Sequence, residues 1–349
     1  MTIVCRRFTR KDSGRVIALV EENTRDKSYR KIFLWKFKPA MQMKQVPMWV
    51  LEDTSTKEIV GFVPTIPVEL KCGGKRAKLF WGVDIYQGRK GLGVQMIKAM
   101  LNWRSCGDVT MGKGVSPLGY SIQRKLGWQD SIFPRVMVKP LRPNNIWLQI
   151  TKNNALSEAL GGLSKPLLSV HKAVTRIAAP QDITVSQVKR IDSRFDRFWS
   201  AASKQHKTIV RRDAKYLGWR FDQHPKHKYV KFVATRRGAM VGYMVCRLER
   251  NSKSYKSMAI GFIVDFLVSD AEAFPSLLNS VLAYFDEKRA DIAVTLATDS
   301  TFIKYLKRAG FLRTSKELKV IYHLNALLKC FDGGKELFLT LSDSDGDMR

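Results

Sequence analysis

Four short motifs that each occur twice, in the same order, constrain the fold of this chain more than any other feature of its sequence. The paired motifs are separated by 181 to 184 residues. Four pairs that keep their order, and their spacing to within three residues, indicate two copies of one fold. The pairs are LWKF at 34–37 with GWRF at 218–221, VGF at 60–62 with VGY at 241–243, VD at 83–84 with VD at 264–265, and LGW at 126–128 with AGF at 309–311.

A length of 349 residues is sufficient for two such copies, each with its own buried core. Within the first copy, hydrophobic patterning predicts the order strand, helix, helix, three strands, glycine-rich loop and helix. We place the first domain at residues 1–140, a helical linker at 141–179 and the second domain at 180–349.

The glycine-rich loop, YQGRKGLG at 86–93, is the clearest candidate binding site. Its three glycines let the backbone turn sharply and point several N–H groups inward, and the helix that follows adds its positive N-terminal end. Gln87, Arg89 and Lys90 contribute side-chain donors, so the loop is suited to a pyrophosphate. Its spacing is neither that of a P-loop nor that of a dinucleotide fingerprint.

The loop resembles motif A of the GNAT acyl-CoA N-acyltransferases, in which an Arg/Gln-x-x-Gly-x-Gly/Ala loop holds the CoA pyrophosphate with its amides. Gly91 and Gly93 match the two glycines of that motif. The first position of the motif falls on Gly88, and Gln87 stands one residue before it.

A second stretch, SPLGYSIQRKLGW at 116–128, is similar to the closing helix of the same family, which normally ends Tyr-Glu-Lys-Leu-Gly-Phe. The position of the family's tyrosine, its usual general acid, is Gln123 here. Tyr120 lies one helical turn away on a similar face, and we expect it to protonate the leaving thiolate in place of the absent tyrosine.

The resemblance implies an α+β fold of two tandem GNAT-like domains, each a mixed, mostly antiparallel twisted sheet flanked by helices. It also implies transfer of an acyl group, with acetyl expected, from acetyl-CoA or another acyl-CoA to an amine of a small molecule or sugar, without a metal. Asp84 is the candidate base, although its repeat at Asp265 favours a structural role. The expected cofactor-binding residues are Ile85, Tyr86, Gln87, Gly88, Arg89, Lys90, Gly91, Leu92, Gly93 and Ser116.

The second copy lacks the loop. After the repeated VD motif it reads FLVSDAEAFPS, with Asp270 and Glu272 but no glycine. Acidic side chains repel a pyrophosphate, and a proline cannot offer an amide N–H. We therefore expect acyl-CoA to bind the first copy alone, with the second copy either shaping the acceptor site or serving as a scaffold.

The net charge of +30 favours an anionic partner, such as CoA, an acidic carrier protein, nucleic acid or a membrane surface. Two other function classes stay open. One is a Fem-type aminoacyltransferase, which resembles this chain in being a tandem GNAT fold and uses tRNA. The other is a non-catalytic module that binds CoA or another anion.

Five cysteines without C-x-x-C spacing argue against a disulfide framework or a zinc site. The first residues carry charges and no apolar signal region, and no apolar run reaches the roughly 18 residues of a membrane span. We expect a cytoplasmic protein. The sequence does not indicate an oligomeric state.

Residues 144–177 show a helical stripe of apolar residues at alternating steps of four and three. Gly161, Gly162 and Pro166 interrupt it, so we expect two shorter helices that pack on a neighbouring domain, with an interfacial membrane helix as the alternative. After a strand at 336–341, the tail DSDGD is expected to be acidic and frayed. The stripe consists of Leu156, Leu160, Leu163, Leu167, Val170, Val174 and Ile177.

Overall fold

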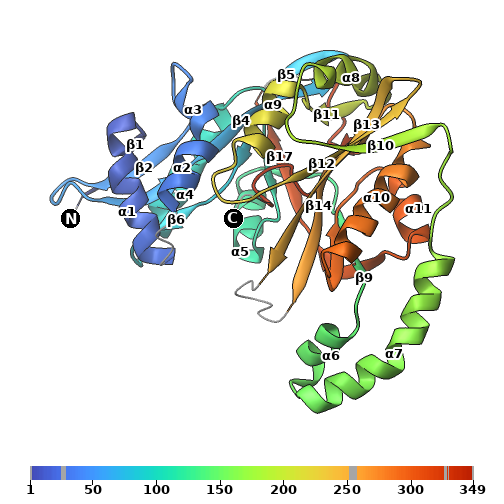
Figure 1. Cartoon of the computed structure of the whole chain (residues 1–349). Coiled ribbons are helices and arrows are strands. Elements are labelled where there is room, and N and C mark those ends of the chain that lie inside the picture. Colours follow the sequence, from blue (N-terminus) through green and yellow to red (C-terminus); the bar gives the residue numbers. More distant parts are fainter. Residues whose placement is uncertain (1, 25–28, 251–257, 326–327, 329, 348–349) are drawn as a thin grey trace.

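The computed structural model describes residues 2–24, 29–250, 258–325, 328 and 330–347. Two halves lie side by side, each built on a curled mixed sheet with helices against it (Figure 1). The expected α+β class, with mixed and mostly antiparallel sheets, is confirmed. None of the described helices is both long enough and apolar enough to cross a membrane.

The first half, together with the two helices that follow it, comprises β1 (Ile3–Arg7), α1 (Ser13–Thr24), α2 (Tyr29–Lys36), α3 (Lys38–Met41), β2 (Trp49–Asp53), β3 (Ile59–Val63), β4 (Thr65–Cys72), β5 (Lys75–Gly82), β6 (Tyr86–Gln87), α4 (Gly93–Leu101), β7 (Val109–Lys113), α5 (Pro117–Lys125), β8 (Gln129–Asp130), β9 (Arg135–Pro140), α6 (Asn144–Thr151) and α7 (Asn154–Val174).

The second half comprises β10 (Ile183–Val188), α8 (Arg194–Ala202), β11 (Thr208–Val210), α9 (Ala214–Leu217), β12 (Val230–Arg236), β13 (Ala239–Arg250), β14 (Ala259–Val268), α10 (Ala273–Glu287), β15 (Ile292–Thr295), α11 (Ser300–Arg308), β16 (Leu312–Glu317), β17 (Val320–Leu324) and β18 (Leu337–Phe338).

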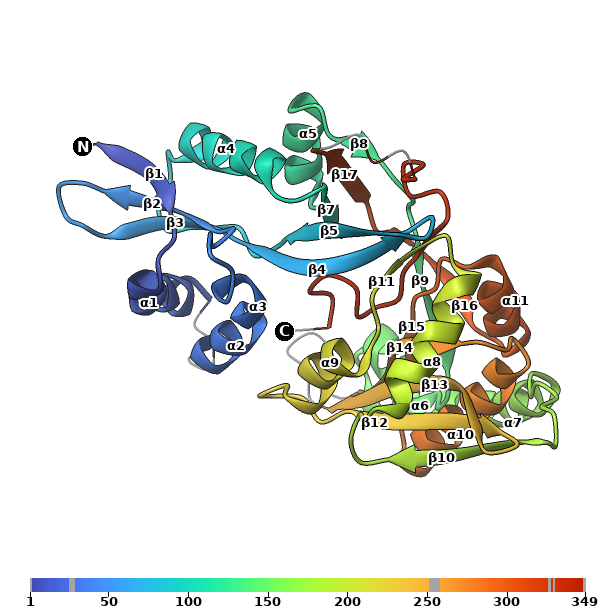
Figure 2. The same cartoon turned by 90° about the horizontal axis from the view of Figure 1, so that it is seen from above.

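Two interrupted strands connect the sheets of the first half. β3 and β4 follow each other around Pro64, and β5 and β6 are separated by a bulge at Asp84, whose φ is +44°. The sheet β1-β2-β3-β6 therefore continues into the sheet β18-β11-β4-β5-β7-β17-β8. Helices α1 to α3 cover one face, and α4 and α5 cover the other (Figure 2). The core between these layers includes Phe33, Phe62 and Trp81, all nearly inaccessible to solvent.

Each half contributes strands to a sheet of the other: β9 comes from the first half, and β11, β17 and β18 come from the second. β9 lies between β15 and β16 in the sheet of the second half, β10-β12-β13-β14-β15-β9-β16. β17 lies between β7 and β8 in the sheet of the first half. Both seven-stranded sheets thus contain strands from the two halves of the chain. The division at residues 140 and 180 stays a prediction, and any such division must allow for these exchanged strands.

The repeated motifs occupy corresponding positions. Trp35 and Trp219 stack with ring centroids 5.5 Å apart, and each indole Nε1 donates to the backbone carbonyl of the other, at 2.7 and 3.0 Å. Gly127 and Gly310 each follow a helix, α5 and α11, with φ of +83° and +79°. Reciprocal contacts of this kind are expected across a pseudo-twofold axis, so they support the duplication inferred from the sequence.

The segment between the halves differs from expectation. α7 is one helix that runs through Gly161, Gly162 and Pro166, and Figure 1 shows it bending along its length. Gly161 is required by packing, because a Cβ there would lie 2.5 Å from Oδ1 of Asn144 in α6. The prediction of two shorter helices within the stripe was wrong, since its residues from Leu156 to Val174 lie on the single bent helix α7.

Candidate active site

The sheet of the first half opens where two parallel strands diverge. β5 and β7 pair at three positions, the last being Trp81 opposite Met111. Beyond it β5 bulges at Asp84 and continues as β6 beside β3, whereas β7 ends at Lys113. Beyond this point the backbone N–H and C=O groups of β5 and β7 no longer form hydrogen bonds with each other. α4 and α5 follow these two strands and lie on the same face of the sheet (Figure 2).

The three positions of the loop before α4 are occupied by glycine for different physical reasons. A Cβ on Gly88 would lie 2.5 Å from Cδ1 of Leu19, so any other residue there would require the Leu19 side chain to move. Gly91 has φ +86°, a conformation that other residues adopt with strain. A Cβ on Gly93 would meet no atom within 4 Å, so this glycine leaves the start of α4 uncovered.

The N-terminus of α4 can therefore accept an anion. Leu92 is the N-cap and supplies no side-chain hydrogen bond, and the first N–H groups of a helix have no partner within the helix. Lys90 is exposed beside them. Arg89, in contrast, pairs with Asp53 at 2.8 Å, and the Gln87 side chain donates to the Arg89 carbonyl at 2.7 Å. These contacts hold the loop in shape.

The other expected binding residues have mixed roles. The Tyr86 ring packs edge-on against Tyr29, and Ile85 is exposed. Ser116 is the N-cap of α5, where its Oγ accepts from the N–H of Gly119 at 3.1 Å.

The structure does not bring Tyr120 to Asp84. The Tyr120 hydroxyl donates to Asp130 at 2.9 Å, and this hydrogen bond, with a smaller contribution from desolvation, raises the Tyr120 pKa. Asp130 belongs to β8, three strands from β5 in the sheet order, which is roughly 14 Å at the usual strand spacing.

Gln123 is a site residue that the sequence marked only as a replacement for tyrosine. It is 3% exposed, and among the described residues its Oε1 has no hydrogen-bond partner. Its Nε2 lies 4.0 Å from the point where a Cβ on Gly112, in β7, would stand. An unpaired buried amide oxygen is costly, which makes Oε1 of Gln123 a candidate acceptor for a donor group of a ligand.

Asp84 lies in a buried ion pair at the bulge. Nζ of Lys36, from α2, contacts Asp84 at 2.5 Å and Asp345 of the C-terminal tail at 3.1 Å. Exposure of the Lys36 and Asp84 side chains is 1% and 4%. Sequence patterns could not identify Lys36 as the partner of Asp84, because the two residues are 48 positions apart.

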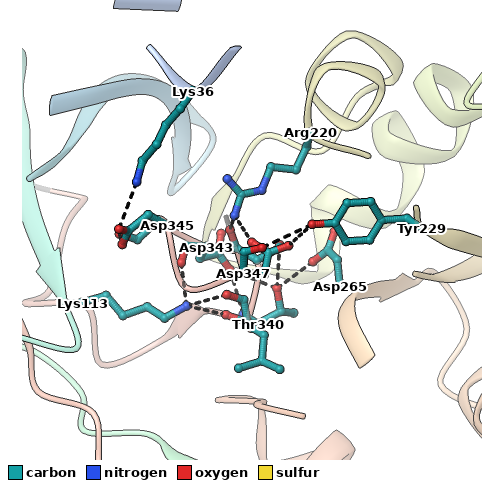
Figure 3. Close-up of polar contacts among 12 residues, drawn as sticks. Lys36, Lys113, Arg220, Tyr229, Asp265, Thr340, Asp343, Asp345 and Asp347 are labelled. Atoms are coloured by element: carbon teal, nitrogen blue, oxygen red, sulfur yellow. Dashed lines mark hydrogen bonds and ion pairs between the residues drawn. The ribbon is translucent and has the colours of Figure 1, made fainter. Parts of the chain in front are cut away.

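The C-terminal tail is buried between the two halves, so the prediction of a frayed terminus was wrong. Figure 3 shows Asp343, Asp345 and Asp347 among basic side chains from both halves. Nζ of Lys113 donates to the carbonyls of Thr340, Leu341 and Asp343 at 2.9, 3.0 and 2.6 Å. Burial lowers the Lys113 pKa to about 8, against the opposing effect of the Asp343 carboxylate. Neutralisation by these cations explains how an acidic tail is buried.

Asp265, the equivalent aspartate of the second half, is held by an ion pair and hydrogen bonds. Asp265 accepts from Arg212 at 3.1 Å, from the Tyr243 hydroxyl at 2.7 Å and from Thr340 at 2.7 Å. Arg212 also pairs with Asp343 at 2.6 Å. Burial acts to lower the Arg212 pKa, but the carboxylates of Asp265 and Asp343 outweigh burial, so the pKa is raised. These contacts assign Asp265 a structural role.

In the second half, the stretch that replaces the glycine loop forms ion pairs and buries apolar side chains. Arg236 pairs with Asp270 and, at 2.8 Å, with Glu272. Phe274 and Pro275, in the first turn of α10, are buried. Among the described residues, no group of three His, Cys, Asp or Glu side chains lies close enough to hold a metal ion.

A cavity of about 720 Å³ lies where the two halves meet on the side of α3. Phe80, Tyr216 and Trp219 give it an aromatic wall, and Lys38 and Asp213 add charges of both signs. A cavity of this size and character accommodates a small polar molecule.

No protein-family model matches the sequence, and a search of curated proteins finds no match. Solved structures do match. A GCN5-related N-acetyltransferase from Anabaena variabilis has a TM-score of 0.64 and 10% identity, with 94% of this chain and 74% of that chain covered. A protein from Enterococcus faecalis described as a probable N-acyltransferase has a TM-score of 0.65 and 12% identity, with 95% and 75% covered.

Saccharomyces cerevisiae N-myristoyltransferase with bound myristoyl-CoA has a TM-score of 0.57 and 13% identity, with 92% of this chain and 79% of that chain covered. Identities this low establish the fold alone. The chain has the GNAT fold of the N-acetyltransferases and N-myristoyltransferases.

Proposed function

We propose that this protein is an acyl-CoA-dependent N-acyltransferase, with acetyl-CoA or another acyl-CoA as donor and the first half as its binding site. The observation that carries the proposal is the uncapped N-terminus of α4, which follows a glycine loop beside the divergent strands β5 and β7. The GNAT fold supports it, and one of the similar structures contains myristoyl-CoA.

The residues at this site fit an acyl-CoA. The amides at the start of α4 and the exposed Lys90 would hold the pyrophosphate, because both present positive charge to an anion. The unpaired Oε1 of Gln123 would accept from an amide N–H of the pantetheine arm. Acyl-CoA supplies the acyl group as an activated thioester.

Asp84 is the group that would take the proton from the acceptor amine, directly or through one water. It lies at the bulge where β5 leaves β7, and Lys36 fixes the position of its carboxylate. Asp84 would thus have two roles, as proton acceptor and as partner of a buried lysine. These roles are separable by experiment.

We place the acceptor in the cavity between the halves. Its wall includes Trp219, which stacks on Trp35, and the next residue along the chain, Lys36, holds Asp84. In this proposal the second half contributes the acceptor site, and the acceptor is a small amine or an amino sugar.

The test is the release of free CoA, followed by mass spectrometry, from a series of acyl-CoAs with a panel of polyamines and amino sugars. We expect turnover that stops in Gly91→Ala. The matched control is Gly74→Ala, because Gly74 has φ +85° against +86° for Gly91 and both have open space around them. Because both variants introduce the same backbone strain, a loss of turnover in Gly91→Ala alone reports a loss of ligand binding and not a loss of stability.

Two results would contradict the proposal. Acyl-CoA binding without turnover on any amine would favour a non-catalytic module. Transfer from aminoacyl-tRNA, with no response to acyl-CoA, would favour a Fem-type aminoacyltransferase.

A further inference from the structure

Five of the seven residues of the apolar stripe are exposed, and they extend along α7 from near its start to its last residue. Their side chains are 48% to 78% accessible to solvent, although aliphatic residues are usually buried. The first and last lie 18 residues apart, which is roughly 27 Å of helix. Figure 1 shows α6 and α7 projecting from the second half. These side chains are Leu156, Leu163, Leu167, Val170 and Val174.

A different face of α7 makes the contacts with the protein. Ser157 and Gly161 are buried, and Oγ of Ser164 accepts from Nε1 of Trp147 in α6 at 2.8 Å. At 100° per residue these positions lie about 100° around the helix from the stripe. The stripe is therefore not a core face displaced by a small shift of the helix. It is a second apolar face that the described residues leave uncovered.

The surroundings of the stripe are basic. Residues 141–177 contain five Lys or Arg and one acidic residue, Glu158. Lys165 is exposed on the face of α7 opposite the stripe, and Arg176 is exposed two residues beyond the end of the helix. At the C-terminal end of α7, Lys139 donates both to Thr175 and to the carbonyl of Ala309, so the exposed end of α11 lies beside it. This basic surface complements an anionic partner.

A second copy of this chain fits the stripe poorly. Full burial removes about 60–120 Å² of apolar surface per Leu or Val side chain from water. At the observed exposure, five such side chains offer roughly 200–400 Å², below the ~800 Å² per partner of a standard interface. Two copies would also bring together two chains of charge +30.

We propose that α7 docks on an anionic lipid membrane, with its apolar stripe in the boundary between headgroups and acyl chains and the basic residues near the headgroups. A membrane needs no complementary shape and continues beyond the stripe in every direction, so a narrow aliphatic band with basic surroundings suffices. The helix lies on the membrane and does not span it. This surface is independent of the acyl-CoA site.

Co-sedimentation of the full chain with vesicles tests the proposal. We expect binding to vesicles of phosphatidylcholine with phosphatidylserine, weaker binding to phosphatidylcholine alone, and a decrease with added salt. Leu163→Glu with Leu167→Glu should lower the partition coefficient about tenfold or more, because two of five inserted side chains become charged. The matched control is Leu118→Glu, since Leu118 on α5 is 72% exposed and Leu163 is 74% exposed.

Three outcomes would overturn the proposal. The first is an absence of vesicle binding at low salt. The second is equal binding by the double variant and the wild type, with the folded state of both checked by circular dichroism. The third is a lipid-free dimer in sedimentation velocity that the double variant abolishes, because the stripe would then be an interface between two copies.

Discussion

Asp84→Asn separates the proposed catalytic role of this residue from its structural role. Lys36 is 1% exposed, so removal of its carboxylate partner leaves a buried charge that Asp345 alone compensates, at 3.1 Å. Breaking a buried pair costs about 3–5 kcal/mol, and with Asp345 retained we expect about 2–3 kcal/mol. For 349 residues the unfolding entropy is about 0.7 kcal/mol/K, so the melting temperature should fall by roughly 3–4 °C.

A double-mutant cycle measures the pair itself. We expect a coupling free energy above about 1.5 kcal/mol between Lys36→Met and Asp84→Asn in denaturant unfolding. The matched control is the exposed pair of Arg135 and Glu317, whose side chains are each 45% exposed and whose coupling should be about 0–1 kcal/mol. A coupling at Lys36 and Asp84 no larger than in the control would refute the reasoning. If Asp84 is also the base, turnover of the folded Asp84→Asn variant should fall by about 10² or more.

Three further predictions follow from the site. Lys90→Glu should weaken acyl-CoA binding at low salt about tenfold, because a contact to phosphate worth roughly 1.5–3 kcal/mol is reversed, while Lys98→Glu at the far end of α4 should have little effect in calorimetry. Lys113 has a folded pKa of about 8 against 10.5, so the unfolded state binds more protons between these values. The free energy of unfolding should then rise with pH by about 1.4 kcal/mol per unit from pH 8 to 10.5, and Lys113→Met should lack this rise in urea titrations. Tyr120→Phe should keep most of its turnover, since the hydroxyl is bonded to Asp130; a fall of 10² or more in steady-state kinetics would return Tyr120 to the mechanism.

Local features of the fold could be predicted from the sequence, whereas nonlocal pairings could not. Gly91 is explained by its own backbone conformation, with φ +86°, and the repeated tryptophans do meet. The exchange of β9 and β17 leaves no trace in the local pattern, because a short apolar strand fits either sheet. Register and partner are decided by tertiary packing.

The buried tail was missed for a similar reason. An acidic stretch is typical of a solvated terminus unless cations surround it. Here those cations come from four distant positions, and although two of them belong to a repeated motif, no local pattern pairs any of them with the tail. They are Lys36, Lys113, Arg212 and Arg220. The periodicity of α7 predicted a helix correctly but could not show which of its faces the protein covers.

Hydrogen–deuterium exchange of the full chain with and without acyl-CoA tests the central claim most directly. We predict slower exchange in peptides that cover residues 86–96 and the start of α5 when acyl-CoA is present at saturation, because a bound pyrophosphate occupies those amides. Peptides that cover residues 269–276 should exchange at the same rate in both states. Protection confined to the second half, or no protection at residues 86–96 under saturating acyl-CoA, would contradict the account.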